Sequence, residues 1–414
     1  MDFEELVHRG LSLPEPWKIE GAEDDQEAML VENRVSHEAG TGACPECGKA
    51  CQQHDTVERR CRHLDMWSYQ TWITCRVPNV RCAEHKVRRI DVPWSDGWAR
   101  FTAQFECVVI DWLKVASMTA TARNLGLSRD QVNGIQERAV KRDLARREAI
   151  SPSKIGVDET SFQKRHEYVT IVTDLDKSRV LYVADGRGKD PLNGFFKGLS
   201  EDQVRGIDFI SMDMHLPYIY SAAWYLPRPL EQICFDRFHV AQLFSRAVDQ
   251  TRRAEAKRLA KEGDDSPKST RYLWLQSAGN LPRKLRKQLC GLLETCASVG
   301  EVWAIKEAAS KLWHYKSKTW AQKARVALSR AAREVGSPAL NMTMDTVLRH
   351  LFEIINAIVH GVSNAGSESV NSRVQALKKR ANGYRSRRRF RDAILFHLGG
   401  LDLHPMTGVS LKCQ

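Results

Sequence analysis

Three acidic residues, widely separated along the chain, place the strongest constraint on its fold. Asp158 ends the apolar run IGVD, Asp213 ends FISMD, and Glu368 lies in the polar segment SNAGSESVN. The first two are 55 residues apart, which suits neighbouring strands joined through a hairpin, a helix and a return strand. The last two are 155 residues apart, which is too far for one compact fold unless a domain intervenes. We therefore expect a mixed α/β core that a second domain interrupts.

The composition narrows the class of protein and of partner. With 414 residues, of which 42% are hydrophobic, the chain is expected to form two to four globular domains. A formal charge of +12 and a pI near 9.2 favour a polyanionic partner. The acidic start has no signal-peptide core and no apolar run reaches ~20 residues, so we expect a cytoplasmic protein without a membrane partner. In that compartment the 11 cysteines are expected to be thiols and metal ligands.

Strand and helix patterns alternate after residue 150. Strands are expected at 155–158, 168–173, 180–184, 207–212 and 232–235. Helices are expected near 191–199 and 217–225, between the last three strands. Residues 238–360 show helical spacing with many Lys and Arg and no strand pattern, which predicts an all-helical insertion.

Cysteines near the N-terminus have the spacing of a zinc ribbon. The segment CPECG resembles a knuckle, in which a tight turn directs Cys44 and Cys47 at one point. The pair Cys82 and His85 repeats the spacing and is expected to complete a tetrahedral Zn²⁺ site. A third pair, Cys51 and His54, has the same spacing and remains an alternative, although it follows Cys47 closely. Buried apolar cysteines would be the structural alternative.

A helix-turn-helix pattern follows the cysteines. Gly126 can adopt the positive φ that ends a first helix, and Ser128 with Gln131 has the spacing of a capping box that starts a second. Arg129, Gln131 and Asn133 would then lie in the first turns of a recognition helix, where side chains reach base edges. The alternative is an ordinary helical hairpin with a solvated basic face.

The helix expected from about Ser367 combines an acid with a basic run. Glu368, Asn371 and Lys378 recur at helical spacing on one polar face. The basic residues expected to bind DNA phosphates are Lys378, Lys379, Arg380, Arg385, Arg387, Arg388 and Arg389. A basic run is often only a solvated face, but here aromatic residues interleave and the run follows the acid directly.

Taken together, these motifs resemble the DDE transposases of bacterial insertion sequences of the ISL-three type over nearly the whole chain. The similarity rests on the CPECG knuckle, the helix-turn-helix, VDETSF, MDM, FDRFH, ESVN and KRANGY. It implies a ribonuclease H-like core and a metal-binding triad of Asp158, Asp213 and Glu368. It also implies that the ribbon and the helix-turn-helix recognise terminal inverted repeats. His85 stands where a cysteine is more usual, and a serine replaces the glycine that often follows the catalytic Glu.

The predicted fold is a multidomain α+β protein: a zinc ribbon, a helix-turn-helix and a ribonuclease H-like mixed α/β core interrupted by an all-helical insertion. The domain boundaries expected from the sequence are 1–40 for a lead-in, 41–93 for the ribbon, 98–150 for the helix-turn-helix, 151–237 and 361–400 for the two core parts, 238–360 for the insertion, and 401–414 for a tail.

The expected function is that of a transposase with two Mg²⁺ (or Mn²⁺) ions at the triad, which cleaves DNA and transfers strands without a covalent protein–DNA intermediate. Asp236, His239 and Asn371 would support the metal ligands, although the first two suit a structural role equally well. The expected partners are double-stranded DNA, as terminal inverted repeats and target, and further copies of the chain in a homodimer or higher oligomer that pairs the ends. The bound protein would associate with the nucleoid. The alternatives are a non-catalytic DNA-binding regulator and a structure-specific nuclease.

Overall fold

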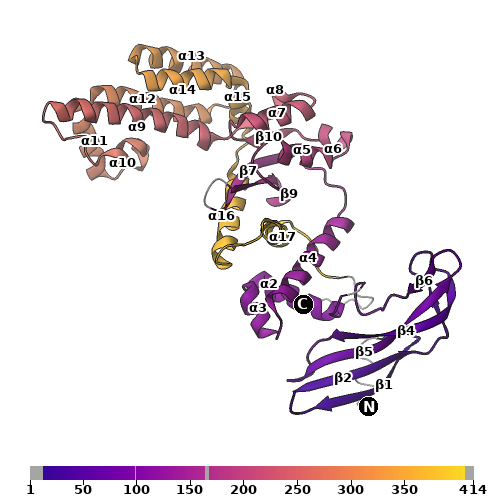
Figure 1. Ribbon diagram of the computed structural model, residues 1–414. Coiled ribbons are helices and arrows are strands. Elements are labelled where there is room, and N and C mark those ends of the chain that lie inside the picture. The colour runs from indigo at the N-terminus through magenta and orange to yellow at the C-terminus, as the bar shows by residue number, and fades with distance from the viewer. Residues whose placement is uncertain (1–12, 98, 164–166, 406–414) are drawn as a thin grey trace. The chain divides into compact units, whose positions relative to one another are not determined.

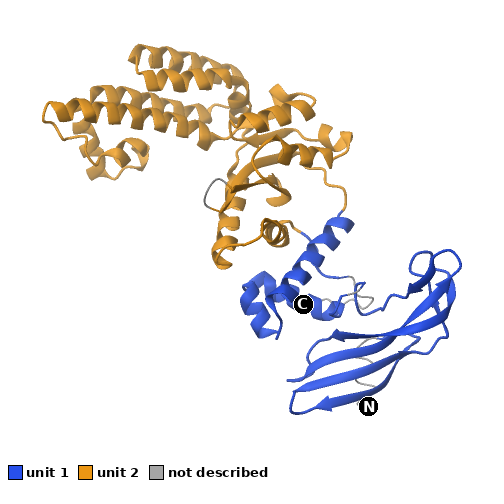
Figure 2. Ribbon diagram, in the orientation of Figure 1, with its two compact units in different colours: residues 1–147, 401–414 blue, residues 148–400 orange. Residues whose placement is uncertain are grey.

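The computed structural model describes residues 13–97, 99–163 and 167–405. The chain forms two compact units (Figure 2): residues 1–147 with 401–414, and residues 148–400. The expected mixed α+β fold with an N-terminal zinc ribbon is confirmed. The first part of the predicted lead-in and the end of the predicted tail, residues 1–12 and 406–414, lie outside the described residues. No described helix combines the length and apolarity needed to cross a bilayer.

The first unit is built on a twisted sheet of six strands (Figure 1). They are β1 (Trp17–Asp25), β2 (Leu30–His37), β3 (Thr41–Ala43), β4 (Ala50–Arg62), β5 (Gln70–Cys82) and β6 (Lys86–Arg89). The order is β1-β2-β5-β4-β3, and β6 pairs with β5. β2 runs parallel to β5, so β1 and β2 are continuous with the sheet that carries the cysteines.

Three helices complete the first unit: α2 (Ala103–Val115), α3 (Met118–Asn124) and α4 (Arg129–Arg146). Gly126 takes a φ of +64° in the turn between α3 and α4. The predicted capping box is confirmed, because the amide of Gln131 donates to the Ser128 hydroxyl and the Gln131 side chain accepts from the Ser128 amide. Each helix therefore starts at a side-chain cap, which satisfies amides that would otherwise lack partners.

The second unit contains a five-stranded mixed sheet. Its strands are β7 (Lys154–Gln163), β8 (Glu167–Asp174), β9 (Arg179–Asp185), β10 (Phe209–Met212) and β11 (Ile233–Phe235), in the order β11-β10-β7-β8-β9. β7, β8 and β9 are antiparallel neighbours, whereas β10 and β11 run parallel to β7. The strands expected from the sequence are confirmed in kind and in order. This arrangement agrees with the ribonuclease H-like core that the resemblance implies.

Helices cover both faces of this sheet, and alternation along β7 decides which residues face which layer. The odd-numbered Ile155 and Val157 pack into the main core with α5 (Lys189–Lys197) and α7 (Leu216–Tyr225). Gly156, Asp158, Thr160 and Phe162 face the other way, toward α16 (Ala365–Arg380) and α17 (Arg387–Leu398). The short helices α6 (Glu201–Arg205) and α8 (Pro229–Gln232) lead into β10 and β11.

The predicted helical insertion follows β11 directly. Its helices are α9 (Arg237–Lys261), α10 (Arg271–Leu275), α11 (Arg283–Thr295), α12 (Ala297–Ser310), α13 (Lys318–Val335), α14 (Pro338–Arg349) and α15 (Leu351–His360). Trp274 is fully buried among them. The Lys306 ammonium donates to the carbonyls of Trp274 and Gln276, at 3.0 and 2.9 Å, and so ties α12 to the end of α10. The apolar core of the insertion is continuous with that of the sheet.

Candidate functional site

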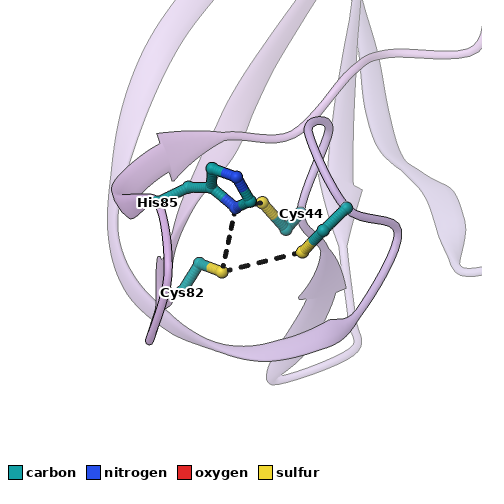
Figure 3. Close-up of side chains that lie close together, drawn as sticks. Cys44, Cys82 and His85 are labelled. Atoms are coloured by element: carbon teal, nitrogen blue, oxygen red, sulfur yellow. Dashed lines mark hydrogen bonds between the residues drawn. The ribbon is translucent and has the colours of Figure 1, made fainter.

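The zinc site lies where two hairpins of the first unit meet (Figure 3). Cys44 and Cys47 occupy the turn between β3 and β4, and Cys82 and His85 occupy the turn between β5 and β6. The Gly48 amide donates to the Cys44 carbonyl at 2.8 Å, and Gly48 takes a φ of +70°. That positive φ closes the knuckle and explains the glycine of the CPECG motif.

Three of the six separations between the ligand atoms match the edges of a tetrahedral Zn²⁺ site, and all four atoms lie within 4.8 Å of one another. The Cys47 and Cys82 sulfurs are 3.8 Å apart, and Nδ1 of His85 lies 3.8 Å from the Cys44 sulfur and 3.6 Å from the Cys82 sulfur. Zn–S bonds near 2.3 Å and Zn–N bonds near 2.05 Å in a tetrahedron require edges of about 3.6–3.8 Å. Hydrogen bonds from the backbone of His85 and Glu84 lower the pKa of Cys82 to about 6, which favours the thiolate that zinc requires.

The alternative pair is not part of this cluster. The Cys51 thiol donates to the Lys49 carbonyl, and Nδ1 of His54 lies 3.3 Å from the Arg81 guanidinium. His85 therefore completes the group of four, and among the described residues this is the one group of Cys, His, Asp or Glu side chains placed to hold a metal ion.

Asp158 and Asp213 lie opposite each other on the neighbouring inner strands β7 and β10 of the second unit's sheet. β10 pairs with β7 so that Ser211 stands opposite Gly156, and the same offset carried two residues further places Asp213 opposite Asp158. β11 pairs with β10 so that Phe235 stands opposite Met212, which places Asp236 next in the row. Asp213 and Asp236 thus directly follow the ends of β10 and β11, and Asp158 lies beside them within β7. β7 continues to Gln163, so the expectation that Asp158 ends its strand is wrong.

Burial perturbs Asp158 more than any neighbouring charge does. Loss of solvent raises the pKa of Asp158 to about 6, and the nearby carboxylates of Glu159 and Asp213 act in the same direction. His239 opposes them. Its own pKa is raised chiefly by its hydrogen bond with Asp236, whose carboxylate lies 3.3 Å from the ring. A cation bound between these carboxylates would relieve the repulsion that the buried acids experience.

A glycine seats the start of α16 on β7. A β-carbon on Gly156 would lie 2.0 Å from the Ser367 hydroxyl and 2.9 Å from the Asn364 side-chain oxygen. The Asn364 amide also donates to Asp236, at 3.3 Å. The first turn of α16, which carries Glu368, is therefore held against the row of aspartates by close packing and by one hydrogen bond.

Polar contacts continue along α16. Nδ2 of Asn371 donates to Asp158 at 2.7 Å, and one and two turns further on Gln375 donates to Thr160 at 2.6 Å and Lys378 to the Ser161 carbonyl at 2.8 Å. The side-chain oxygen of Asn371 is buried and has no protein partner. Asn371 thus orients Asp158 and offers an unused oxygen beside it.

Glu368 lies on the first turn of α16 and is exposed. Within the described part of the chain, Asp158, Asp213 and Glu368 are not gathered as closely as the zinc ligands are. The structure brings the two aspartates together and places the glutamate on the helix that contacts Asp158.

The predicted base readers differ in accessibility. Arg129 is exposed on the first turn of α4. The Gln131 side-chain oxygen is engaged in the cap of its own helix. Asn133 is only 9% exposed, so its side chain is not presented to DNA. Arg129 is thus the most accessible of the three residues that the sequence singled out.

Most of the predicted phosphate-binding residues are exposed, and several of them also contact the protein. Lys378 donates to β7, and Arg387 lies 3.2 Å from Glu167. Arg380 approaches the His397 ring at 3.1 Å. Lys379, Arg385, Arg388 and Arg389 are exposed on the segment that joins α16 and α17 or on the adjoining turns. α17 itself is anchored by the fully buried Phe390, which packs against Phe162 of β7.

Sequence reasoning missed two features of the site. The first is Gly156, which lets the start of α16 pack closely against β7. A glycine inside an apolar strand often marks such a close approach, so the sequence did indicate it. Glu159 lies on the opposite face from Asp158, and burial followed by the charge of Asp213 raises its pKa. An acid directly after Asp158 was visible, but its orientation toward Tyr218 and Arg187 depends on the fold.

Comparisons with known proteins identify the family of both units. Residues 155–394 match the model of the ISL3-type DDE family, described as a transposase, and residues 40–85 match the zinc-finger of transposase IS204/IS1001/IS1096/IS1165. A transposase for insertion sequence element IS1001 of Bordetella parapertussis is 26% identical over 359 residues, which cover 84% of this chain and 86% of the relative. A transposase for insertion sequence element IS1557 of Mycobacterium tuberculosis is 26% identical over 413 residues, which cover 89% of this chain and 88% of the relative.

Proposed function

The chain belongs to the ISL3-type family of insertion-sequence transposases, and from that premise we propose that Asp158, Asp213 and Glu368 bind two Mg²⁺ ions for cleavage and joining of DNA ends. The observation that carries the proposal is the register of β7 and β10, in which Asp158 and Asp213 stand opposite each other. Mn²⁺ is expected to substitute, because both ions prefer oxygen ligands in octahedral sites.

The residues present suit a hard cation. All the candidate ligands are oxygens, and burial raises the pKa of Asp158 to about 6, so a bound cation would favour its ionised form. The unpartnered Asn371 oxygen can accept a hydrogen bond from metal-bound water. When bound, the ions would supply the positive charge that activates water or a DNA 3′-hydroxyl and that stabilises the pentacoordinate transition state at phosphorus.

The protein's own groups would orient and support these ligands. Asn371 holds one Asp158 oxygen in place, and Asp236 fixes the start of α16 through the Asn364 amide. The His239 ring lies 3.3 Å from the Asp236 carboxylate and so orients that carboxylate beside the metal ligands. The start of α16 already packs against β7 at Gly156. The Glu368 side chain on that turn would therefore need only to rotate toward the aspartates when DNA and metal bind.

DNA would be held by both units. We propose that the zinc ribbon and α4 recognise the terminal inverted repeats, with Arg129 at a base edge. The exposed cations between α16 and α17 would contact the phosphates of the cut strand. Pairing of two ends requires two active sites, so the working form is proposed to be a homodimer or a larger oligomer that also captures target DNA.

The test is a cleavage and strand-transfer assay on duplexes that carry the element's ends. Asp158→Asn, Asp213→Asn and Glu368→Gln should each abolish cleavage and joining while end binding stays within about two-fold, because affinity comes mainly from Lys and Arg contacts. Near-normal strand transfer by any one variant would remove that residue from the site. Cleavage without joining by the wild type would favour the nuclease alternative, and binding without cleavage would favour the regulator.

A further inference from the structure

The outer face of α7 is apolar along its whole length although it is exposed. Leu216, Tyr220 and Trp224 recur at a spacing of four residues and are 53%, 56% and 82% exposed. With Ala223 they form what we term the α7 stripe, and no residue of this ten-residue helix is charged. Surface helices normally carry polar side chains on their outer face, and a contiguous apolar exception marks a binding surface.

The opposite face of α7 is firmly anchored. Tyr218 is fully buried, and its hydroxyl lies 2.9 Å from that of Thr170 on β8. The Ser221 hydroxyl donates to Asn193 of α5 at 2.7 Å, and Tyr225 stacks on Phe196 with ring centroids 5.0 Å apart. Because these contacts fix the rotation of α7, the stripe is held outward as a preformed platform.

Cationic side chains flank the stripe. The loop between β9 and α5 reads Gly186-Arg187-Gly188, and the ammonium of Lys189, the first residue of α5, lies 4.8 Å from the centroid of the Tyr220 ring. The carbonyl of Arg187 is within 2.9 Å of the His215 ring, which ties this loop to the start of α7. Asp190 is the exposed acid next to these cations. Arg187 itself lies 3.8 Å from Glu159 and stacks over Tyr168.

The stripe begins three residues after Asp213, so its first residue, Leu216, lies close in the chain to the row of aspartates. Aromatic faces beside cations are the combination with which proteins hold single-stranded nucleic acid: the rings stack on bases and the cations contact phosphates. Paired bases hide their faces, so only an unpaired or unstacked strand can use the rings. From Leu216 to Trp224 the helix rises about 12 Å, which matches three to four stacked nucleotides.

We infer that the α7 stripe binds a short unpaired stretch of DNA next to the phosphate that is cut, with Tyr220 and Trp224 stacking on bases and Lys189 contacting the backbone. The inference rests on the proposed function, because that function places the cut phosphate at Asp158 and Asp213. It adds that the ends are locally opened before cleavage.

The first test measures binding of the full-length, zinc-loaded chain to a ten-nucleotide thymidine oligonucleotide, without divalent metal. Trp224→Ala and Tyr220→Ala should each weaken binding about five-fold or more. Lys189→Gln should lower the salt dependence of binding by about 0.7 in slope, the value for one lost single-strand phosphate contact. Trp320→Ala is the matched control, because Trp320 is 60% exposed on α13 and also lies beside a lysine, Lys323. An equal loss in the control would overturn the assignment.

Conservative variants identify what covers the stripe. Trp224→Phe should restore most of the oligonucleotide binding, whereas Trp224→Leu should not, because only an aromatic ring stacks on a base. If leucine restores binding as well as phenylalanine does, the side chain does not stack on bases, and the inference is overturned in favour of an apolar protein partner. A change from oligomer to monomer in Trp224→Ala without DNA would likewise assign the stripe to a second copy of this chain and overturn the inference.

A second test links the stripe to cleavage. Duplex ends with a preformed three-nucleotide mismatch beside the cut should rescue Trp224→Ala, because the opened strand no longer has to be captured. Fully paired ends should be cut at least about five-fold more slowly by the variant than by the wild type. If the wild type cuts neither substrate, the proposed function fails on its own. If it cuts both and the variant matches it, only the α7 stripe inference fails.

Discussion

Replacing Gly156 with alanine should displace the start of α16 and thereby slow cleavage far more than it weakens DNA binding. The added β-carbon would lie 2.0 Å from the Ser367 hydroxyl, 2.8 Å from a Leu175 methyl and 2.9 Å from the Asn364 side-chain oxygen. Ordinary contact starts near 3.4 Å, so the nearest atom must retreat by about 1.4 Å. Rotation of Ser367 alone leaves the other two contacts in place, and the first turn of α16 has to shift.

The expected magnitude follows from that shift. Overpacking of this kind costs about 1–3 kcal/mol, which should lower the melting temperature of the second unit by about 2–10 °C. A displacement of about 1 Å at a catalytic group costs on the order of 100-fold in rate. Glu368 lies one residue beyond Ser367, so we expect a loss of that size in end cleavage with binding to end duplexes changed less than about two-fold.

The assay compares initial cleavage rates, end binding and thermal unfolding for three variants. Gly291→Ala is the matched control, because a β-carbon there meets nothing within 4 Å and α11 gains a better helix former. Ser367→Ala in the Gly156→Ala background removes the closest atom and should recover part of the rate, with non-additive energies that reveal the contact. Wild-type cleavage and stability in Gly156→Ala would refute the idea that α16 is seated through this glycine.

Three further predictions concern zinc, DNA reading and pH. Cys44→Ser should lose its zinc and specific end binding, whereas Cys51→Ser should keep about one equivalent by metal analysis. Arg129→Ala should lower the preference for the element's ends over random duplex, whereas Arg385→Ala should weaken both alike and reduce the salt slope by about 0.9; equal losses for both duplexes in Arg129→Ala would exclude α4 as the sequence reader. Burial lowers the pKa of His63 to about 4, so its stabilisation is complete above pH 6.5 and is lost as the pH falls toward 4, up to about 3 kcal/mol; thermal unfolding of His63→Gln should show a smaller loss over that range than the wild type.

Several parts of the molecule were predictable because local chemistry determines them. The spacing of 55 residues between Asp158 and Asp213 is the register offset of β7 and β10, so the strand path expected from the sequence leads directly to their pairing. The Ser128 capping box and the knuckle at Cys44 depend on a few adjacent residues, and both formed as expected. Alternation and helical spacing likewise located the core and the insertion.

Other parts depend on tertiary packing that no local pattern encodes. Asn133 is on the expected helix, but its side chain is buried within the first unit. The capping box already implied that the Gln131 side chain caps its own helix. From its place on the first turn we nevertheless also expected this side chain to contact base edges. The sequence could not show that Trp224 is exposed, because every residue of α7 is uncharged. The rotation of α7 about its axis is set instead by the contacts of Tyr218 and α5.

The hydrogen bond from the Asn364 amide to Asp236 has an evolutionary consequence. Asp236 caps the first helix of the insertion, and Asn364 directly precedes α16, the helix that follows the insertion's last one, so the two ends of the inserted segment meet. A segment whose ends meet can lengthen, shorten or be exchanged without changing the distance between the residues on either side of it. We therefore expect the interval between Asp213 and Glu368 to tolerate changes in length, provided that the junction at Asp236 and Asn364 is kept.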